Sequence, residues 1–191
     1  MLSGMALPRK KPATYEDLLA APEHLVAEIV DDELYTSPRP ASPHALAATS
    51  LTAQLVGPLG HDRRGIPGGW VILIEPELHI VDQVMVPDLA AWRRERMPEV
   101  PNAPFFDLAP DWLCEVVSPS TGALDRAKKM PHYARAGVGR VWLVDPTPKT
   151  LELYRLDGDG WRLVATHEGE AVVRAAPFEA IDLSLPALWA R

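Results

Sequence analysis

The stretch Trp112-Leu113-Cys114-Glu115-Val116-Val117 is apolar except for one carboxylate, and a turn-forming Ser118-Pro119-Ser120 follows it. A short apolar run of this kind predicts a buried β-strand. A second stretch, Met85-Val86-Pro87-Asp88-Leu89-Ala90-Ala91-Trp92, has the same character and also carries one acid in its middle. An isolated carboxylate is costly to bury, so each acid is expected to meet a cation or a strong hydrogen-bond donor.

These two acids suggest a site for a divalent cation. Mg²⁺ is typically held by one or two carboxylates, a carbonyl oxygen and waters, together with phosphate oxygens of a substrate. Asp88, Glu115 and the carbonyl of Val116 are the candidate ligands for Mg²⁺ or Mn²⁺. The next predicted helix carries Asp125 and Lys129 four residues apart on one face, and Lys129 is a candidate for stabilising developing negative charge.

The order of elements predicts an α/β fold with a central mixed sheet flanked by helices. Side chains alternate along a strand, so Glu115 should share a face with Leu113 and Val117, opposite Cys114. The expected elements are a helix at 15–21, a hairpin at 25–35, a helix at 42–59, strands within 70–92 and at 112–118, a helix at 123–136, a strand at 140–146 and a hairpin at 151–167.

Two helices carry more detailed expectations. The helix at 42–59 has leucines at helical spacing, which predict its buried face. These leucines are Leu46, Leu51, Leu55 and Leu59. The helix at 123–136 contains Pro131, which should kink it and so alter the direction of Lys129.

Composition limits the domain organisation and the class of protein. A chain of 191 residues predicts one domain, 13–191, preceded by a loose arm at 1–12. The net charge of −7 argues against a strongly basic nucleic-acid binder, although a local basic groove remains compatible with it. The single cysteine allows no internal disulfide, and no apolar stretch approaches the roughly 18 residues of a membrane span. We therefore expect a cytoplasmic protein without a membrane partner.

Several of these motifs together resemble a known family. The pattern Pro87-Asp88 with Glu115-Val116-Val117 resembles the PD-(D/E)XK nuclease superfamily. The segment from Glu115 to Thr121, with Asp125, Lys129 and Tyr133 and the later stretch 141–146, is similar to the bacterial Uma2 family of restriction-endonuclease-like proteins. The resemblance extends from about residue 14 to residue 189.

The resemblance implies a restriction-endonuclease-like core and a Mg²⁺- or Mn²⁺-dependent endonuclease that acts on DNA. It implies that Asp88 and Glu115 bind the metal and that Lys129 replaces the lysine that the superfamily usually places two residues after the second acid, where this chain has Val117. Glu28 matches an acid that completes the site from the first hairpin. His44 matches a histidine near the phosphate or a metal water, and a homodimer would suit cleavage of both strands.

Each of these residues also has an ordinary structural interpretation. Asp88 could cap a turn, and Glu115 could form an ion pair with Arg126 or Lys129. Glu28 could pair across the sheet with an arginine, His44 could be a surface residue, and Asp125 with Lys129 could be a simple helix ion pair.

The same alternatives apply to function. A nuclease fold that only binds a partner or nucleic acid, without catalysis, is favoured by Val117. Hydrolysis of another small phosphate ester is a third possibility. The histidines show no clustering at zinc-ligand spacing, which disfavours a zinc enzyme.

Overall fold

A six-stranded sheet forms the centre of the computed structural model, which describes residues 11–60, 69–119 and 121–189. The predicted arm at 1–12 lies outside the described residues except for residues 11 and 12. All neighbouring strands are antiparallel except β7 and β8. In order across the sheet, the strands are β10 (Gly160–Glu168), β9 (Thr150–Asp157), β8 (Arg140–Asp145), β7 (Trp112–Val116), β6 (Leu89–Arg93) and β3 (Trp70–Ile74).

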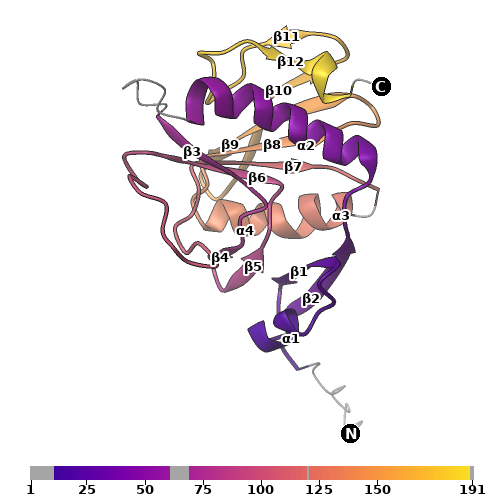
Figure 1. The fold of residues 1–191 in the computed structure, drawn as a ribbon, viewed down its shortest axis with the longest axis vertical. Helices are drawn as coiled ribbons and strands as arrows, with labels where there is room; N and C mark the ends of the chain where they lie inside the picture. The colour runs from indigo at the N-terminus through magenta and orange to yellow at the C-terminus, as the bar shows by residue number, and fades with distance from the viewer. Residues whose placement is uncertain (1–10, 61–68, 120, 190–191) are drawn as a thin grey trace, which may run out of the picture.

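Helices cover both faces of this sheet (Figure 1). On one face lies α2 (Ser42–Leu55), which continues into a π-helical turn η1 (Val56–Gly60). On the other lies a helical segment made of α3 (Gly122–Leu124), the π-helical turn η2 (Asp125–Lys129) and α4 (Met130–Arg135). Parallel strands cannot be joined by a tight turn, so this second segment is the crossover that β7 and β8 require.

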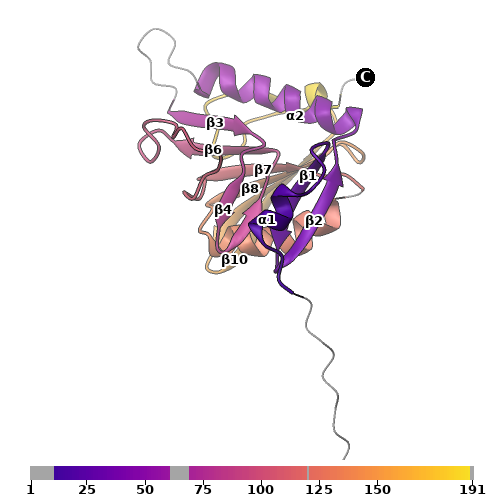
Figure 2. The ribbon, with the colours of Figure 1, turned by 60° about the horizontal axis from the view of Figure 1, so that its bottom comes forward.

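A smaller sheet packs beside the crossover helix (Figure 2). Its order is β2 (Glu33–Pro38), β1 (Leu25–Val30), β5 (Gln83–Met85) and β4 (Leu78–Ile80), and α1 (Tyr15–Leu19) precedes it. The hairpin turn at Asp31 and Asp32 has φ values of 53° and 64°, as a primed turn requires. The Asp31 carboxylate reaches the helix, where it pairs with Lys128 at 2.8 Å and His132 at 2.9 Å.

The chain ends in a small two-stranded sheet and a short 3₁₀ helix. These elements are β11 (Val172–Val173), β12 (Leu183–Ser184) and η3 (Leu185–Leu188). The observed element order confirms the predicted mixed α/β fold. The predicted closing hairpin is also confirmed and corresponds to β9 and β10.

The alternation predicted for the acid-bearing strand is also observed. Trp112, Cys114 and Val116 belong to the core under α2, together with Leu51 and Leu55. Leu113 and Val117 belong to the opposite core, together with Tyr133 of α4. Strand β7 is buried along its whole length, so Glu115 faces the crossover helix from within the protein.

The buried face of α2 agrees with the prediction at Leu51 and Leu55 but not at Leu46. Ala47, Leu51 and Leu55 are fully buried at intervals of four residues, whereas Leu46 lies about one helical step away and is 38% exposed. The α-helix also ends at Leu55 and not near Leu59, because the chain widens into a π turn around Pro58, which has no N–H to donate.

Proline has a related effect in the crossover helix. The sequence predicts a kink at Pro131, and the distortion takes the form of the π turn η2 immediately before it. The Met130 N–H bonds the carbonyl of Asp125, five residues back, in place of the usual four. Such widened turns are common at functional sites, and this one contains both Asp125 and Lys129.

The assignment of the α2 face can be tested by two leucine truncations. Leu51→Ala should lower the free energy of unfolding by about 2–5 kcal/mol, because a fully buried side chain leaves a cavity. Leu46→Ala, the matched control on the exposed flank, should cost no more than about 1 kcal/mol. Urea denaturation of both variants provides the comparison, and equal losses would contradict the assignment.

Candidate functional site

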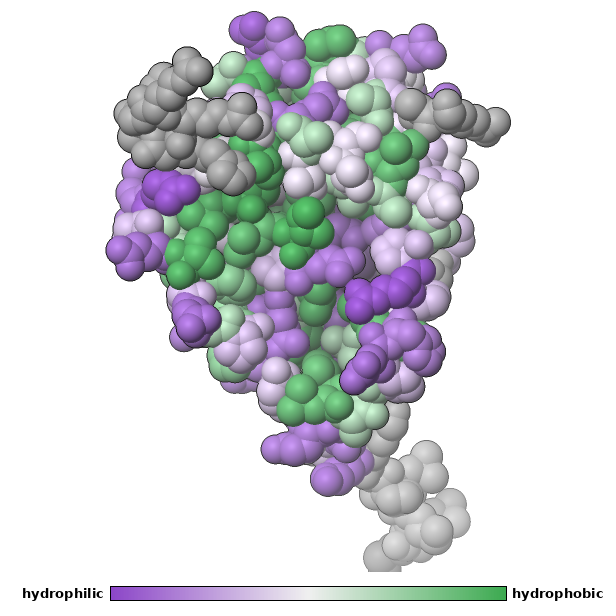
Figure 3. All heavy atoms as spheres, in the orientation of Figure 1, coloured by the Kyte–Doolittle hydropathy of each residue, from purple (hydrophilic) through white to green (hydrophobic). Residues whose placement is uncertain are grey.

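A cavity of about 260 Å³ opens at the end of the central sheet, between the β1–β2 hairpin, the start of α2 and the crossover helix. The surface is hollowed in this region and hydrophilic side chains surround the hollow (Figure 3). Among the residues that the structure describes, its lining includes five carboxylates and three basic side chains: Glu28, Glu75, Asp88, Glu115 and Asp125, and Arg39, His44 and Lys129. The acids outnumber the bases, which favours a cationic ligand.

Lys129 joins two of these acids inside the protein. Its Nζ lies 2.8 Å from Oε1 of Glu28 and 2.8 Å from Oε1 of Glu115, and all three side chains are almost completely buried. Burial by itself would lower the pKa of Lys129, but the charges of Glu115 and Glu28 outweigh it and raise that pKa well above its ordinary value. Lys129 is therefore a fixed ammonium ion at the bottom of the cavity.

Glu115 has a second donor in Tyr133. The phenol hydroxyl donates to Oε1 of Glu115 at 2.6 Å, so Tyr133 does more than pack in the core. Burial raises the pKa of Glu115 well above its ordinary value, and the charges of Asp125 and Asp88 add to this effect while Lys129 opposes it. Any additional positive charge nearby would stabilise the ionised form of such a carboxylate.

Glu28 enters the site from strand β1. Its Oε1 accepts the Val86 N–H at 2.7 Å, which ties the hairpin to the segment that leads to Asp88. The basic partner of Glu28 is Lys129 and not the cross-strand arginine considered from the sequence. The contact forms because the crossover helix passes over both β7 and the hairpin.

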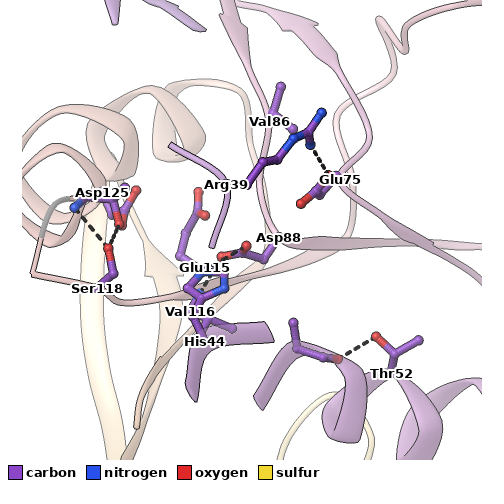
Figure 4. Close-up of polar contacts among 12 residues, drawn as sticks. Arg39, His44, Thr52, Glu75, Val86, Asp88, Glu115, Val116, Ser118 and Asp125 are labelled. Carbon is purple, nitrogen blue, oxygen red and sulfur yellow. Dashed lines mark hydrogen bonds and ion pairs between the residues drawn. The ribbon is translucent and has the colours of Figure 1, made fainter. Parts of the chain in front are cut away.

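Asp88 stands at a bend just before β6, and not in the middle of a strand as predicted. Leu89 pairs with Cys114, so continuing the antiparallel register places Asp88 opposite Glu115 at the end of the sheet. Oδ2 of Asp88 accepts the Val116 N–H at 2.7 Å, and both acids line the same cavity (Figure 4). The side chain of Asp88 is 15% exposed, so it remains accessible from the cavity.

His44 reaches Asp88 from the first turn of α2. Its Nε2 lies 3.1 Å from Oδ1 of Asp88, while its buried Nδ1 has no hydrogen-bond partner among the described residues. Burial lowers the pKa of His44, but the hydrogen bond to Asp88 and the nearby acidic charges raise it above its ordinary value on balance. His44 is thus part of the cavity wall and not a surface histidine.

Asp125 completes the acidic group from the π turn. Its Oδ1 is 3.5 Å from Nζ of Lys129, and this pair is buried, unlike an ordinary helix ion pair on the surface. Burial raises the pKa of Asp125, and Lys129 partly offsets the effect. Asp125 therefore adds to the negative charge that faces the cavity.

The donor set suits a hard divalent cation. No group of three or more histidine, cysteine, aspartate or glutamate side chains among the described residues is arranged to hold a metal. Mg²⁺ needs only one or two protein carboxylates and completes its shell with waters and substrate oxygens. Asp88 and Glu115, on one cavity wall with an excess of acids around them, fit that requirement, and the Val116 carbonyl remains a predicted third ligand.

Two cavity residues were not predicted from the sequence to belong to the site. Arg39 lies in the loop between β2 and α2, and Glu75 follows β3. Glu75 stands at a bend and forms an ion pair with Arg39 at the cavity. Neither residue belongs to a periodic element, so only the three-dimensional arrangement identifies them.

Comparison with known proteins assigns the chain to a family. The sequence profile described as "Uma2: Putative restriction endonuclease" matches residues 12–187. The chain belongs to the Uma2 family. This family is grouped with PD-(D/E)XK-like nucleases, which typically use divalent metals.

A solved structure shares the fold of this Uma2 protein. It is described as a "putative nuclease belonging to DUF820" from Anabaena variabilis, and it superimposes with a TM-score of 0.75 at 23% identity, covering 94% of this chain and 98% of that one. No curated protein matches the chain. None of the described helices is long and apolar enough to cross a membrane.

The ion-pair cluster makes a prediction about stability. Lys129→Met should lower the free energy of unfolding by about 3–5 kcal/mol, because Glu28 and Glu115 lose their buried counter-charge. The neighbouring Lys128→Met removes an exposed pair with Asp31 and should cost no more than about 1 kcal/mol. Chemical denaturation without added metal measures both, and a Lys129 effect as small as that of Lys128 would show that the cluster is not stabilising.

A second prediction concerns pH. Because the folded pKa of Glu115 lies above its ordinary value of 4.5, its contribution to stability is complete at low pH and is lost as the pH rises from 4.5 through the folded pKa. With a chelator present, the wild type should therefore lose stability relative to Glu115→Gln as the pH rises over this window. Denaturation at several pH values checks this, and a difference that does not change with pH would refute it.

Proposed function

We propose that this Uma2 protein is a Mg²⁺- or Mn²⁺-dependent endonuclease that hydrolyses phosphodiester bonds of DNA. The observation that carries the proposal is the joint presence of Asp88, Glu115 and the buried ammonium of Lys129 on one cavity. The family assignment supports the nuclease class, and the excess of cavity carboxylates supports a divalent cation.

Asp88 and Glu115, with the carbonyl of Val116, would hold the cation. When bound, the ion would neutralise phosphate charge and lower the pKa of a water molecule. The hydrogen bond from Val116 N–H orients Asp88, and the Tyr133 hydroxyl orients Glu115. Both carboxylates are thus positioned by the protein before any ligand arrives, which is a requirement for precise catalytic geometry.

Lys129 would stabilise the negative charge that develops on the phosphate. The superfamily's usual lysine position is occupied by Val117, whose side chain packs in the core and contributes no charge. Lys129 supplies the ammonium from the crossover helix, and Glu28 holds it toward Glu115. The contact between Glu28 and Lys129 supports a role for Glu28 in positioning the amine.

His44 and Asp125 would have supporting roles at the cavity. The hydrogen bond from His44 Nε2 to Oδ1 of Asp88 helps to fix that carboxylate. Asp125 makes the longest contact to Lys129, at 3.5 Å, so it is the partner that a substrate oxygen would displace most easily. Cleavage of both DNA strands would be served by two copies of the chain.

Nicking of supercoiled plasmid tests the proposal. Wild type with Mg²⁺ or Mn²⁺ should convert the plasmid to open circles, and Asp88→Asn should reduce the rate by at least about 100-fold because a cation ligand is lost. Asp182→Asn, which removes an exposed carboxylate far from the cavity lining, is the matched control. Equal rates for wild type and Asp88→Asn would reject the assignment of Asp88.

One observation favours a second candidate, a nuclease fold that binds a partner without hydrolysis. Two buried carboxylates already neutralise Lys129, which leaves a closed ion-pair cluster. Titration calorimetry with Mn²⁺ separates the two functions. The endonuclease requires binding heat that is lost in Glu115→Gln, whereas well-folded protein that gives no heat would support the binding module.

A further inference from the structure

Arg39 is the least constrained of the three basic residues on the cavity. It lies in the loop between β2 and α2, and 57% of its side chain is exposed. Its Nη1 is 3.4 Å from Oε2 of Glu75, across the mouth of the cavity (Figure 4). The guanidinium carries five N–H donors, and this long contact, the one that the described residues make with it, leaves most of them available for a ligand.

The other two basic residues of the cavity already have close acidic partners. Lys129 is held at 2.8 Å by each of two acids, and His44 is held by Asp88. Among the cavity residues that the structure describes, Arg39 is therefore the cation most available to an incoming anion. The five carboxylates around it repel a polyanion, so a positive group at the mouth is needed for a DNA backbone to approach.

Glu75 is the acidic residue that Arg39 contacts at the cavity mouth. Its backbone has a φ of 46°, a left-handed conformation that is uncommon for a non-glycine residue and often marks a functional position. Its N–H donates to the carbonyl of Asp88 at 3.0 Å, which links the Arg39–Glu75 pair to one of the proposed cation ligands. The Glu75 carboxylate thus pairs with Arg39, while the Glu75 backbone is hydrogen-bonded to Asp88 of the proposed cation site.

We propose that Arg39 binds a backbone phosphate next to the scissile one, and that Glu75 occupies the guanidinium until DNA displaces it. The inference rests on the proposed function for its substrate. A guanidinium binds phosphate through two parallel hydrogen bonds, a geometry that a carboxylate imitates. Arg39 then increases the affinity for DNA and aligns its backbone. Glu75 weakens the binding of anions that cannot replace it on the guanidinium.

Binding of a short fluorescein-labelled DNA duplex, followed by anisotropy over a range of salt concentrations, tests this inference. Asp88→Asn is the background, so that cleavage does not intervene. Adding Arg39→Gln should weaken binding about tenfold and reduce the slope of log affinity against log salt by about 1. Arg39→Lys should keep the salt slope and recover only part of the affinity, because charge remains while the planar fork is lost.

Removal of the competing carboxylate should have the opposite effect. Glu75→Gln should tighten binding about threefold when Arg39 is present, and this gain should disappear when Arg39→Gln is added. Glu77→Gln, which removes the same charge two residues away and outside this cavity's lining, controls for general repulsion. Circular dichroism melting curves confirm that each variant is folded.

The outcomes separate this inference from the proposed function. Wild type that nicks plasmid, with Arg39→Gln unchanged in affinity and salt slope, would overturn the role of Arg39 alone. Wild type that does not nick, with binding that depends on Arg39 as described, would overturn hydrolysis and retain the phosphate contact. Absence of DNA binding by every variant, or weaker binding by Glu75→Gln, would overturn the inference.

Discussion

The buried ammonium of Lys129 between Glu28 and Glu115 is the interaction on which the site and much of its surroundings depend. It connects three segments that are distant in the sequence: the first hairpin, strand β7 and the crossover helix. Two carboxylates at this depth would be strongly unfavourable without it. Since Lys129 also lines the cavity, the contact that makes the fold tolerate these acids belongs to the candidate site as well.

The chain topology explains why these groups meet. A parallel β7–β8 pair requires a crossover, and the crossover passes over the face of the sheet that carries Glu115. The antiparallel β6–β7 pair brings Asp88 to the same end of the sheet. The π turn before Pro131 then places Asp125 and Lys129 together in a widened helical segment. The site is therefore a consequence of one parallel strand pair and its connection.

Much of this arrangement could be predicted from the sequence because its signals are local. A single acid in an apolar strand identifies Glu115, and alternation assigns it to the face that carries Val117. The position of Asp88 was predicted less well, since the residue lies at a bend and the run of apolar neighbours hides the end of the strand. On α2, leucine spacing identified the buried Leu51 and Leu55, but it could not reveal that Ala47 packs in the core in place of Leu46.

Contacts between distant segments could not be predicted in the same way. The pairing of Glu28 with Lys129 depends on how the hairpin docks on the crossover helix, which no local pattern encodes. Arg39 and Glu75 lie outside the regular elements and carry no periodic signal. The ion pair between Arg39 and Glu75 across the cavity mouth forms only when the sheet is assembled. The same is true of the hydrogen bond from Tyr133 to Glu115.

We propose that the adjacent ends of β6 and β7 form a divalent-cation site beside Lys129. Anomalous diffraction from crystals soaked in Mn²⁺ tests it most directly, because the metal is located independently of activity. An anomalous peak is expected between the carboxylates of Asp88 and Glu115, on the cavity side and within reach of the Val116 carbonyl. A fully occupied peak elsewhere on the protein, with none between these two acids, would contradict it.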